Sequence, residues 1–520
     1  MLKRFVLLAC LLVGVLTGCA VNPVTGKKEF RLVPESTEIN LGSEQYAPGR
    51  QMQGGDYTVD PEVNGYVSSV GNRLAAVSDR ALPYEFKVIN DSTPNAWALP
   101  GGKIAINRGL LTELTSEAEL AAVLGHEIVH AAARHGAKGM ERGLLLQGVV
   151  VAAQAASNNS QYGKLAVGGA ALAGQLIGQK YSREAELEAD HYGMRYMSRA
   201  GYDPQAAIAL QETFVRLFEG QQQDWLSGLF ASHPPSQERV AANRENARQL
   251  PSGGELGGER YRQKIAPLLR AKEAYAAHDE GRKLLAEGKT GQALALAEKA
   301  LALEPREALF HALRGEVRFA EKRYQDAITN YDRAIERNGD YFHFLVMRGL
   351  AHERLGQSDA ATTDLEASVK LLPTAPALNA LGTLALARGE RDKAKAYFAA
   401  AAGSDSASGK AAANALARLD LPDNPDKYLQ LRLGLDSSGY LLAELSNPTG
   451  VTVTDVVCRV QFVDAAGKQR QLNLPAPGAL APGKLVRMET GIGPVANGDA
   501  LKSLQAAVVR ARVAEAEQSE

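Results

Sequence analysis

The sequence contains very little cysteine and no excess of charge of either sign. Three of its 520 residues are cysteines, namely Cys10, Cys19 and Cys458. We expect Cys10 to be removed with an N-terminal signal segment and Cys19 to be modified, so only Cys458 remains. The mature chain can then form no intramolecular disulfide and must be stabilised by its hydrophobic cores. Its 58 basic and 59 acidic residues give a net charge of −1. This balance argues against a large basic surface, and we expect no nucleic acid among the partners.

Long apolar runs are missing except at the N-terminus. A short positive start, Met1 to Arg4, precedes an apolar stretch of signal-peptide length, residues 5–16. The stretch ends in Leu16-Thr-Gly-Cys19, which resembles the bacterial lipobox. The resemblance implies that residues 1–19 are a lipoprotein signal peptide and that Cys19 carries lipid. Ala20 follows instead of aspartate, which favours an anchor in the outer membrane facing the periplasm. An ordinary signal peptide or a short membrane anchor is the alternative.

The length predicts about three domains. After a tether at residues 20–34, residues 35–250 are mostly helical in pattern, with two short strand-like segments at 84–89 and 103–107. The apolar Gly/Ala-rich segment 143–178 is too short and too interrupted for a confident membrane span. It predicts either a packed helical pair or a hairpin that forms a lid or touches a membrane.

A repeat of 34 residues follows a glycine-rich linker near residue 255. The repeat is marked by small residues at two positions that are seven apart, namely Ala293 and Ala300, Ala327 and Ala334, and Ala361 and Ser368. This pattern resembles the tetratricopeptide repeat, and we place an all-α solenoid at residues 265–420. Stacked helix pairs leave a groove that suits peptides or partner proteins. Residues 426–515 alternate like strands and predict an all-β, sandwich-like domain with a default role in binding or assembly.

The most informative stretch is His126-Glu-Ile-Val-His130. Its flanks predict a helix, on which positions i and i+4 share a face, so both histidines can converge on one metal ion with Glu127 beside them as a general base. A catalytic zinc site needs a third protein ligand and an open position. The candidates lie on a second predicted helix, residues 181–190. Its acidic residues form two pairs on different faces, and spacing alone does not choose between them: Glu186 with Asp190, and Glu184 with Glu188.

Taken together, these motifs resemble the HtpX and CAAX-prenyl-protease family of zinc metallopeptidases, and within it the periplasmic BepA-type members with tetratricopeptide repeats. The resemblance covers about residues 30–245, and the repeats extend it to about 420. It implies an α+β, zincin-like metallopeptidase domain with one zinc ion per chain. It assigns the third zinc ligand to Glu186, and it makes Asp190 a residue that orients a ligand histidine. The C-terminal strands are not part of this pattern.

Two further segments resemble the same family. Ser232-His233-Pro-Pro resembles a segment whose histidine can reach the zinc, which makes His233 a fourth ligand in a resting state or a stabiliser of the transition state; the alternative is a loop histidine without zinc contact. Residues 98–106 resemble the strand at the edge of the active site. An extended substrate would add to that strand by β-augmentation, and an ordinary sheet edge is the alternative. The proposed substrate strand consists of Lys103, Ile104, Ala105, Ile106 and Asn107.

The expected mechanism is zinc-assisted hydrolysis of a peptide bond, with Glu127 as the base and an oxyanion donor that is either His233 or Arg183. We expect His135 and His191 to point away from the metal, because on continuous helices both are out of phase with the ligands.

The leading hypothesis is a zinc endopeptidase that removes misfolded or unassembled envelope proteins, with repeats that recruit clients or the outer-membrane assembly machinery. The alternative is a gated or non-proteolytic periplasmic chaperone or scaffold. An intramembrane or prenyl-protein protease is disfavoured, because several long apolar spans would be needed.

Overall fold

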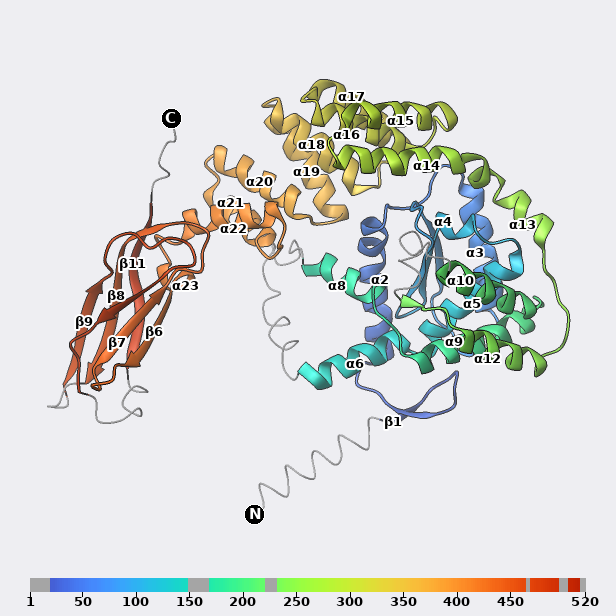
Figure 1. Cartoon of the computed structure of the whole chain (residues 1–520), viewed down its shortest axis with the longest axis horizontal. Helices are drawn as coiled ribbons and strands as arrows, with labels where there is room; N and C mark the ends of the chain where they lie inside the picture. Colours follow the sequence, from blue (N-terminus) through green and yellow to red (C-terminus); the bar gives the residue numbers. More distant parts are fainter. Residues whose placement is uncertain (1–18, 148–167, 220–231, 464–467, 495–503, 515–520) are drawn as a thin grey trace, which may run out of the picture. The chain divides into compact units, whose positions relative to one another are not determined.

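The computed structural model describes residues 19–147, 168–219, 232–463, 468–494 and 504–514. The predicted signal peptide up to residue 18 and the middle of the apolar segment 143–178 therefore lie outside the described residues. The chain divides into two compact units, one ending at Leu372 and the other beginning at Pro373 (Figure 1). This division falls inside the range predicted for the repeats, and the other predicted domain boundaries stay predictions.

A three-stranded sheet lies at the centre of the first unit. Its strands are β3 (Glu85–Ile89), β5 (Lys103–Asn107) and β4 (Ala96–Leu99), in that order, with β5 parallel to β3 and antiparallel to β4. Successive side chains of each strand point to opposite faces of the sheet, so each face contributes to a separate hydrophobic core. One core includes α3 (Pro61–Ala75) and α5 (Glu117–Ala132), and the other includes α2 (Glu35–Met52) and α8 (Gly168–Ile177). Figure 1 shows α2 and α5 on opposite sides of the sheet.

The prediction that Lys103, Ile104, Ala105, Ile106 and Asn107 form an edge strand is wrong. These residues are β5, the middle strand, and both of its sides are paired within the sheet. A substrate strand needs unpaired backbone N–H and C=O groups, which a central strand does not offer. Among the described residues, the edge strands of this sheet are β3 and β4, and β4 is the one that directly precedes β5 in the sequence.

The helices that follow the sheet supply the remaining parts of the site. They are α4 (Arg108–Leu111), α6 (His135–Gln147), α9 (Arg183–Arg199), α10 (Gln205–Glu219) and α12 (Gln237–Arg248). Helix α9 crosses α5 where Gly125 faces Gly193, and a Cβ built on Gly125 would lie 3.2 Å from the Gly193 carbonyl oxygen. Two glycines therefore allow the two helix backbones to approach closely next to His126.

Residues 20–34, predicted as a tether, are ordered against the first unit. They include a hairpin of β1 (Cys19–Val21) and β2 (Lys28–Phe30). The Asn22 side chain donates to the Ala133 carbonyl oxygen at 3.0 Å, and the backbone N–H groups of Leu32 and Val33 donate to Glu141 at 3.1 and 3.0 Å. The segment that follows Cys19 therefore packs close to the end of helix α5.

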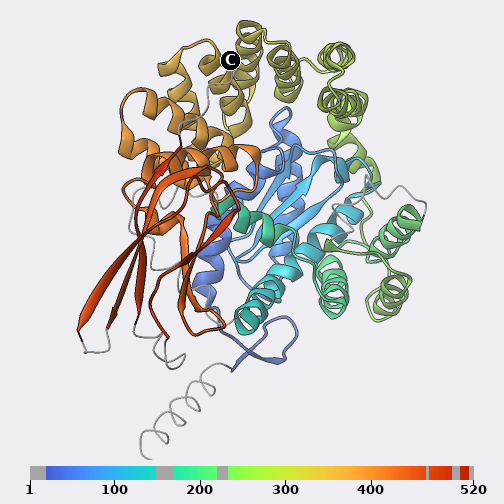
Figure 2. The same cartoon turned by 60° about the vertical axis from the view of Figure 1, so that its left-hand side comes forward.

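Antiparallel helix pairs continue the first unit (Figure 2). They are preceded by α13 (Gly258–Lys264) and comprise α14 (Ala266–Ala286), α15 (Thr290–Leu303), α16 (Ala308–Ala320), α17 (Tyr324–Arg337), α18 (Phe342–Arg354) and α19 (Ser358–Leu371). All six small residues that marked the predicted repeat are fully buried between helices. The predicted helical repeat is therefore confirmed.

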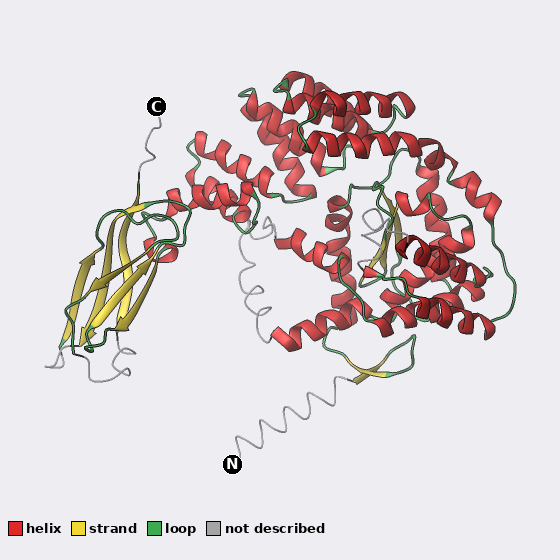
Figure 3. Ribbon diagram, viewed as in Figure 1, coloured by secondary structure: helices red, strands yellow, loops and turns green. Residues whose placement is uncertain are grey.

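The second unit consists of helices followed by two sheets. Its helices are α20 (Ala375–Ala387), α21 (Arg391–Ala401), α22 (Ala407–Asp420) and α23 (Pro425–Tyr428). Its strands are β6 (Gln430–Leu435), β7 (Leu441–Ser446), β8 (Val453–Val463), β9 (Gln469–Pro475), β10 (Leu485–Glu489) and β11 (Gln505–Val513). They form two antiparallel sheets, ordered β10-β7-β6 and β11-β8-β9 (Figure 3). The two sheets share one hydrophobic core. Cys458 is buried in this core as a free thiol.

The fold is thus multidomain, as predicted, with an α+β part, a helical solenoid and a C-terminal pair of antiparallel sheets. Within the described residues, no helix combines the length and the apolar character that crossing a membrane requires.

Candidate metal centre

Helix α5 carries both histidines of the motif. Its start is fixed by Ser116, whose hydroxyl accepts a hydrogen bond from the Glu119 N–H at 3.2 Å. Acidic residues in the first turn interact favourably with the positive end of the helix dipole. The rest of the helix is rich in alanine, leucine and valine and is almost entirely buried. One turn apart, the rings of His126 and His130 lie with their centroids 4.7 Å from each other.

Helix α9 supplies the carboxylate and resolves the choice that the sequence left open. Ser182 caps this helix, and Glu186 and Asp190 face inward, buried at 2% and 7% exposure. Glu184 is exposed on the other side. Glu188 lies outside the cluster and bonds to Lys27 at 2.7 Å. The geometry therefore selects the Glu186 and Asp190 pair.

Four side chains bring potential ligand atoms together: His126, His130, Glu186 and His233. The two Nε2 atoms of the motif histidines are 3.0 Å apart, and Glu186 carboxylate oxygens lie 3.5 and 3.4 Å from them. His233 Nδ1 is 3.3 Å from His126 Nε2 and 3.0 Å from Glu186. Ligands held about 2.0–2.1 Å from a tetrahedral zinc ion are about 3.3–3.4 Å from one another. The donor set and its spacing therefore fit zinc.

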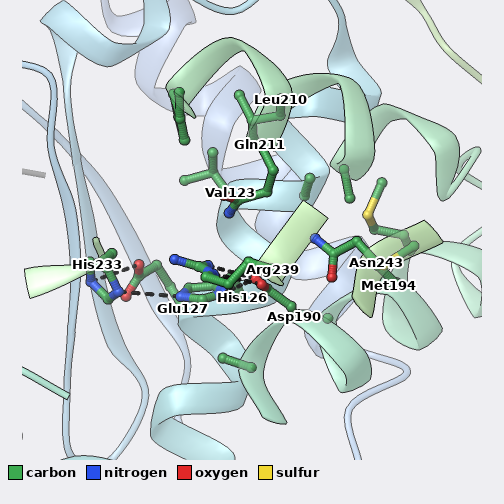
Figure 4. A pocket seen from close by; sticks show the side chains of 16 residues that line it. Val123, His126, Glu127, Asp190, Met194, Leu210, Gln211, His233, Arg239 and Asn243 are labelled. Atoms are coloured by element: carbon green, nitrogen blue, oxygen red, sulfur yellow. Dashed lines mark hydrogen bonds and ion pairs between the residues drawn. The ribbon is translucent and has the colours of Figure 1, made fainter. Parts of the chain in front are cut away.

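Both motif histidines have a polar partner at Nδ1. His126 Nδ1 is 2.9 Å from Asp190, and the Arg239 guanidinium donates two hydrogen bonds of 2.7 Å to the same carboxylate. His130 Nδ1 is 2.9 Å from His135 Nδ1, and the His130 ring stacks on Tyr181 with centroids 3.9 Å apart. Both Nε2 atoms thus face the cluster (Figure 4 shows His126 with Asp190 and Arg239).

Burial and charge set the protonation of the site. Burial raises the pKa of Glu127 above its ordinary value, which suits a general base. Burial also acts to raise the pKa of Glu186, but His233, His126 and His130 hold it well below the ordinary value. For Asp190 the same burial effect is outweighed by Arg239 and His126, so its pKa is lowered and it stays ionised. Burial lowers the pKa of His130 and keeps it neutral, as a metal ligand must be.

Glu127 lies beside the cluster with one oxygen free. Its Oε1 atom is 3.6 Å from His233 Nε2, and its buried Oε2 atom has no hydrogen-bond partner. Next to it is a cavity of about 50 Å³. The apolar part of the wall includes Val123, Met194, Leu210 and Phe214. In Figure 4, Glu127 and His126 lie between His233 on one side and Asp190 on the other.

The structure does not bring Arg183 to the cluster. Its side chain is 71% exposed and pairs with Glu238. The arginine at the site is Arg239, which is 2.9 Å from Glu186 as well as bonded to Asp190. No role was expected for Arg239, because its position beside the cluster depends on the packing of α12 against α9.

His135 does lie outside the cluster, as expected, but the reason is not the phase of a continuous helix. Helix α5 ends at Ala132, and Arg134 adopts a left-handed backbone with φ of 64°, so the helical phase does not continue to His135. His135 instead begins α6 and contacts His130. His191 does point away, as predicted, and bonds to Asn246 at 2.8 Å.

Comparison with known proteins places this geometry in a family. A family model described as peptidase family M48 matches residues 61–247, and a tetratricopeptide-repeat model matches residues 278–341 and 323–376. The chain is 39% identical over 185 residues to the mitochondrial metalloendopeptidase OMA1 of Schizosaccharomyces pombe, covering 34% of this chain and 50% of that protein.

Two Escherichia coli proteins are similar as well. Over 220 residues the chain is 31% identical to the beta-barrel assembly-enhancing protease, covering 39% of this chain and 45% of that protein. Over 185 residues it is 31% identical to the metalloprotease YcaL, covering 33% of this chain and 68% of that protein. The alignments to OMA1 and to the assembly-enhancing protease thus span half or less of those relatives.

Proposed function

Because the chain belongs to peptidase family M48, we propose that it is a zinc-dependent endopeptidase that cleaves misfolded or unassembled envelope proteins. The observation that carries the proposal is the buried cluster of His126, His130 and Glu186 with Glu127 beside it. Such a set of three protein ligands and one adjacent carboxylate is the arrangement of a hydrolytic zinc site.

In the proposed mechanism these three residues hold one zinc ion per chain. When bound, zinc supplies Lewis acidity, which polarises the scissile carbonyl group and makes a water molecule easier to deprotonate. The Glu127 carboxylate takes the proton from that water at its free Oε2 atom and delivers it to the leaving amine. Asp190, held by Arg239, keeps His126 oriented throughout. His233 is the nearer candidate for the oxyanion donor, because Arg183 is exposed and bonded elsewhere.

The proposal for the strand that binds the substrate has to change from the one that the sequence suggested. Since β5 is paired on both sides, we propose that an extended substrate pairs with β4 (Ala96–Leu99) at the edge of the sheet. Helix α5 contacts β4 directly, so the edge strand packs against the helix that carries His126 and His130.

Location and partners rest on the sequence and on the relatives. The lipobox-like sequence around Cys19 supports a lipid anchor in the outer membrane, with the enzyme facing the periplasm. One relative is named a beta-barrel assembly-enhancing protease. On that likeness we propose that the repeats recruit envelope-protein clients or the outer-membrane assembly machinery.

The test compares the wild-type chain with Glu127→Gln. We expect both to bind one zinc ion, and we expect the variant to lose cleavage of an unfolded protein substrate by a factor of about 10² or more, since the base is gone while the ligands remain. Zinc is measured by atomic absorption and cleavage by gel. Glu184→Gln, on the exposed side of α9, is the matched control and should cleave at the wild-type rate. Equal cleavage by Glu127→Gln and the wild type would remove Glu127 as the base.

A second candidate function is supported by the position of His233. A fourth protein ligand completes a tetrahedral site and leaves no position for water, as in structural zinc sites. In that case the chain is a gated enzyme, or a chaperone or scaffold that acts through its repeats. Complementation of a deletion strain by Glu127→Gln would favour this candidate.

A further inference from the structure

A second chain of polar side chains lies behind His130 and has no role in the mechanism above. It runs from His130 Nδ1 to His135 Nδ1 at 2.9 Å, and from His135 Nε2 to Glu188 at 3.4 Å. The other Glu188 oxygen accepts from Lys27 Nζ at 2.7 Å. The two histidines are 1% and 5% exposed, so no bulk water competes for their ring nitrogens.

Only one arrangement of protons along this row of side chains leaves His130 Nε2 available to a metal. A histidine that offers its Nε2 lone pair to a cation must carry its proton on Nδ1. His130 Nδ1 then donates to His135 Nδ1, which must be unprotonated. His135 in turn carries its proton on Nε2, where the Glu188 carboxylate accepts it.

The opposite arrangement would disable the site. If His135 Nδ1 held the proton, it would donate to His130 Nδ1, and the His130 proton would sit on Nε2, pointing at His126 and Glu186. That proton would occupy the lone pair that a metal needs. The Glu188 carboxylate cannot donate a hydrogen bond when ionised, and it therefore selects the first arrangement.

We propose that His135 is a positioning residue that fixes His130 in the tautomer and ring orientation required for metal binding. The inference rests on the proposed zinc site. His135 does for His130 what Asp190 does for His126 on the other side of the cluster. Lys27 contributes little, because its side chain is 70% exposed and its ion pair with Glu188 is screened by solvent.

The backbone that places His135 is held from outside the helix. Arg134, in its left-handed conformation, forms buried ion pairs with Glu38 of α2 and Glu141 of α6. The Arg134 guanidinium also donates to the Val33 carbonyl oxygen at 2.9 Å. These contacts keep the sharp turn between α5 and α6 that brings the His135 ring against His130.

The experiment uses two amide variants of His135 in the full chain. Asparagine places its carbonyl oxygen near the position of the histidine Nδ1 and keeps the acceptor for His130, whereas glutamine places its amide near Nε2 and loses that acceptor. Zinc affinity is measured by competition with a chromophoric chelator at pH 7.5. We expect His135→Gln to weaken zinc binding about 10–100-fold and His135→Asn to retain wild-type affinity.

The controls separate this role from a general loss of structure. His191→Gln on α9 should bind zinc as the wild type does, because His191 bonds to Asn246 away from the cluster. Circular dichroism and the Tm of the zinc-free proteins check the fold. Should His135→Gln fail to fold, Glu188→Leu replaces it, since the loss of the carboxylate should also weaken zinc binding.

Three results would overturn the inference: unchanged affinity in His135→Gln, an equal loss in the Asn and Gln variants, or unchanged affinity in Glu188→Leu. A wild-type chain that binds no zinc would instead refute the proposed function itself.

Discussion

His233 stands out at the scale of single residues, because it is a fourth ligand candidate from a loop rather than from a helix. It precedes two prolines and Ser236, which caps α12 by accepting from the Arg239 N–H at 3.2 Å. The Arg239 side chain also donates to the Pro234 carbonyl oxygen at 3.3 Å. The loop is therefore tied to the same arginine that holds Asp190, and His233 is kept at the cluster by contacts that do not involve its ring.

We predict that His233→Ala separates its two possible roles. The three remaining ligands should retain zinc, as measured by metal content. If His233 closes the fourth position, its loss admits water and cleavage of an unfolded substrate should rise severalfold. If it stabilises the oxyanion, cleavage should instead fall by about 10²–10³. Arg183→Ala, which removes an exposed side chain, is the control and should leave the rate unchanged. An unchanged rate in His233→Ala would contradict both roles.

The residues of the site differ in how far the sequence could reveal them. His126, Glu127 and His130 follow from helical spacing, because i and i+4 on one helix are neighbours whatever the rest of the fold does. Glu186 needed the family resemblance, since spacing left two carboxylate pairs open. The contact of His135 with His130 and the position of Arg239 at the site could not be predicted. They depend on a helix break at Arg134 and on the packing of α12 against α9.

At the scale of elements, the helical repeats share one backbone feature. The turn inside each helix pair contains a residue with a left-handed backbone, and these residues are Gly288, Lys322, Gly356 and Gly389, with φ between 61° and 78°. Three are glycines, for which this conformation carries no steric cost. Lys322 is the exception, and its Cβ is strained against the backbone. The regular spacing of these turns follows the period that the buried alanines predicted.

We predict that Lys322→Gly stabilises the repeats. Relief of the left-handed strain should raise the free energy of unfolding by about 0.5–1 kcal/mol, seen as a higher Tm of the first unit. Lys322 is exposed, so no packing is lost. The matched control is Lys289→Gly, at an exposed position with φ of −84°, where glycine should destabilise because it adds flexibility to the unfolded chain. A lower Tm for Lys322→Gly would show that its side chain contributes more than the strain costs.

The sheet shows what local patterns leave undetermined at this scale. The two predicted strand segments do form strands, as β3 and β5. Their order was not accessible, because β5 pairs in parallel with β3 and takes the central place, while β4 comes between them in the sequence and lies at the edge. Strand order depends on pairing between distant residues, and hydrophobic alternation within a strand carries no information about it.

At the scale of the whole first unit, the central sheet and the repeats are joined by a buried polar network. Glu307, at the start of α16 and 1% exposed, accepts hydrogen bonds from the Asn90 side chain at 3.1 Å and from the Tyr275 hydroxyl at 2.5 Å. Asn90 in turn accepts from Arg108, whose guanidinium lies 3.3 Å from the centroid of the Tyr275 ring. Asn90 directly follows β3 of the central sheet, so the network couples the sheet to the first repeat.

We predict that Glu307→Ala weakens this coupling. The Asn90 amide and the Tyr275 hydroxyl would stay buried without an acceptor, which costs about 2–4 kcal/mol in the free energy of unfolding. Differential scanning calorimetry of the full chain should show the transition of the first unit at a lower Tm and broadened or split, as the repeats and the sheet cease to unfold together. Glu336→Ala, exposed on α17, is the control and should melt like the wild type. If Glu307→Ala melts at the wild-type Tm in one sharp transition, the network does not hold the sheet and the repeats together. The packing of α14 against the sheet domain must then hold them together instead.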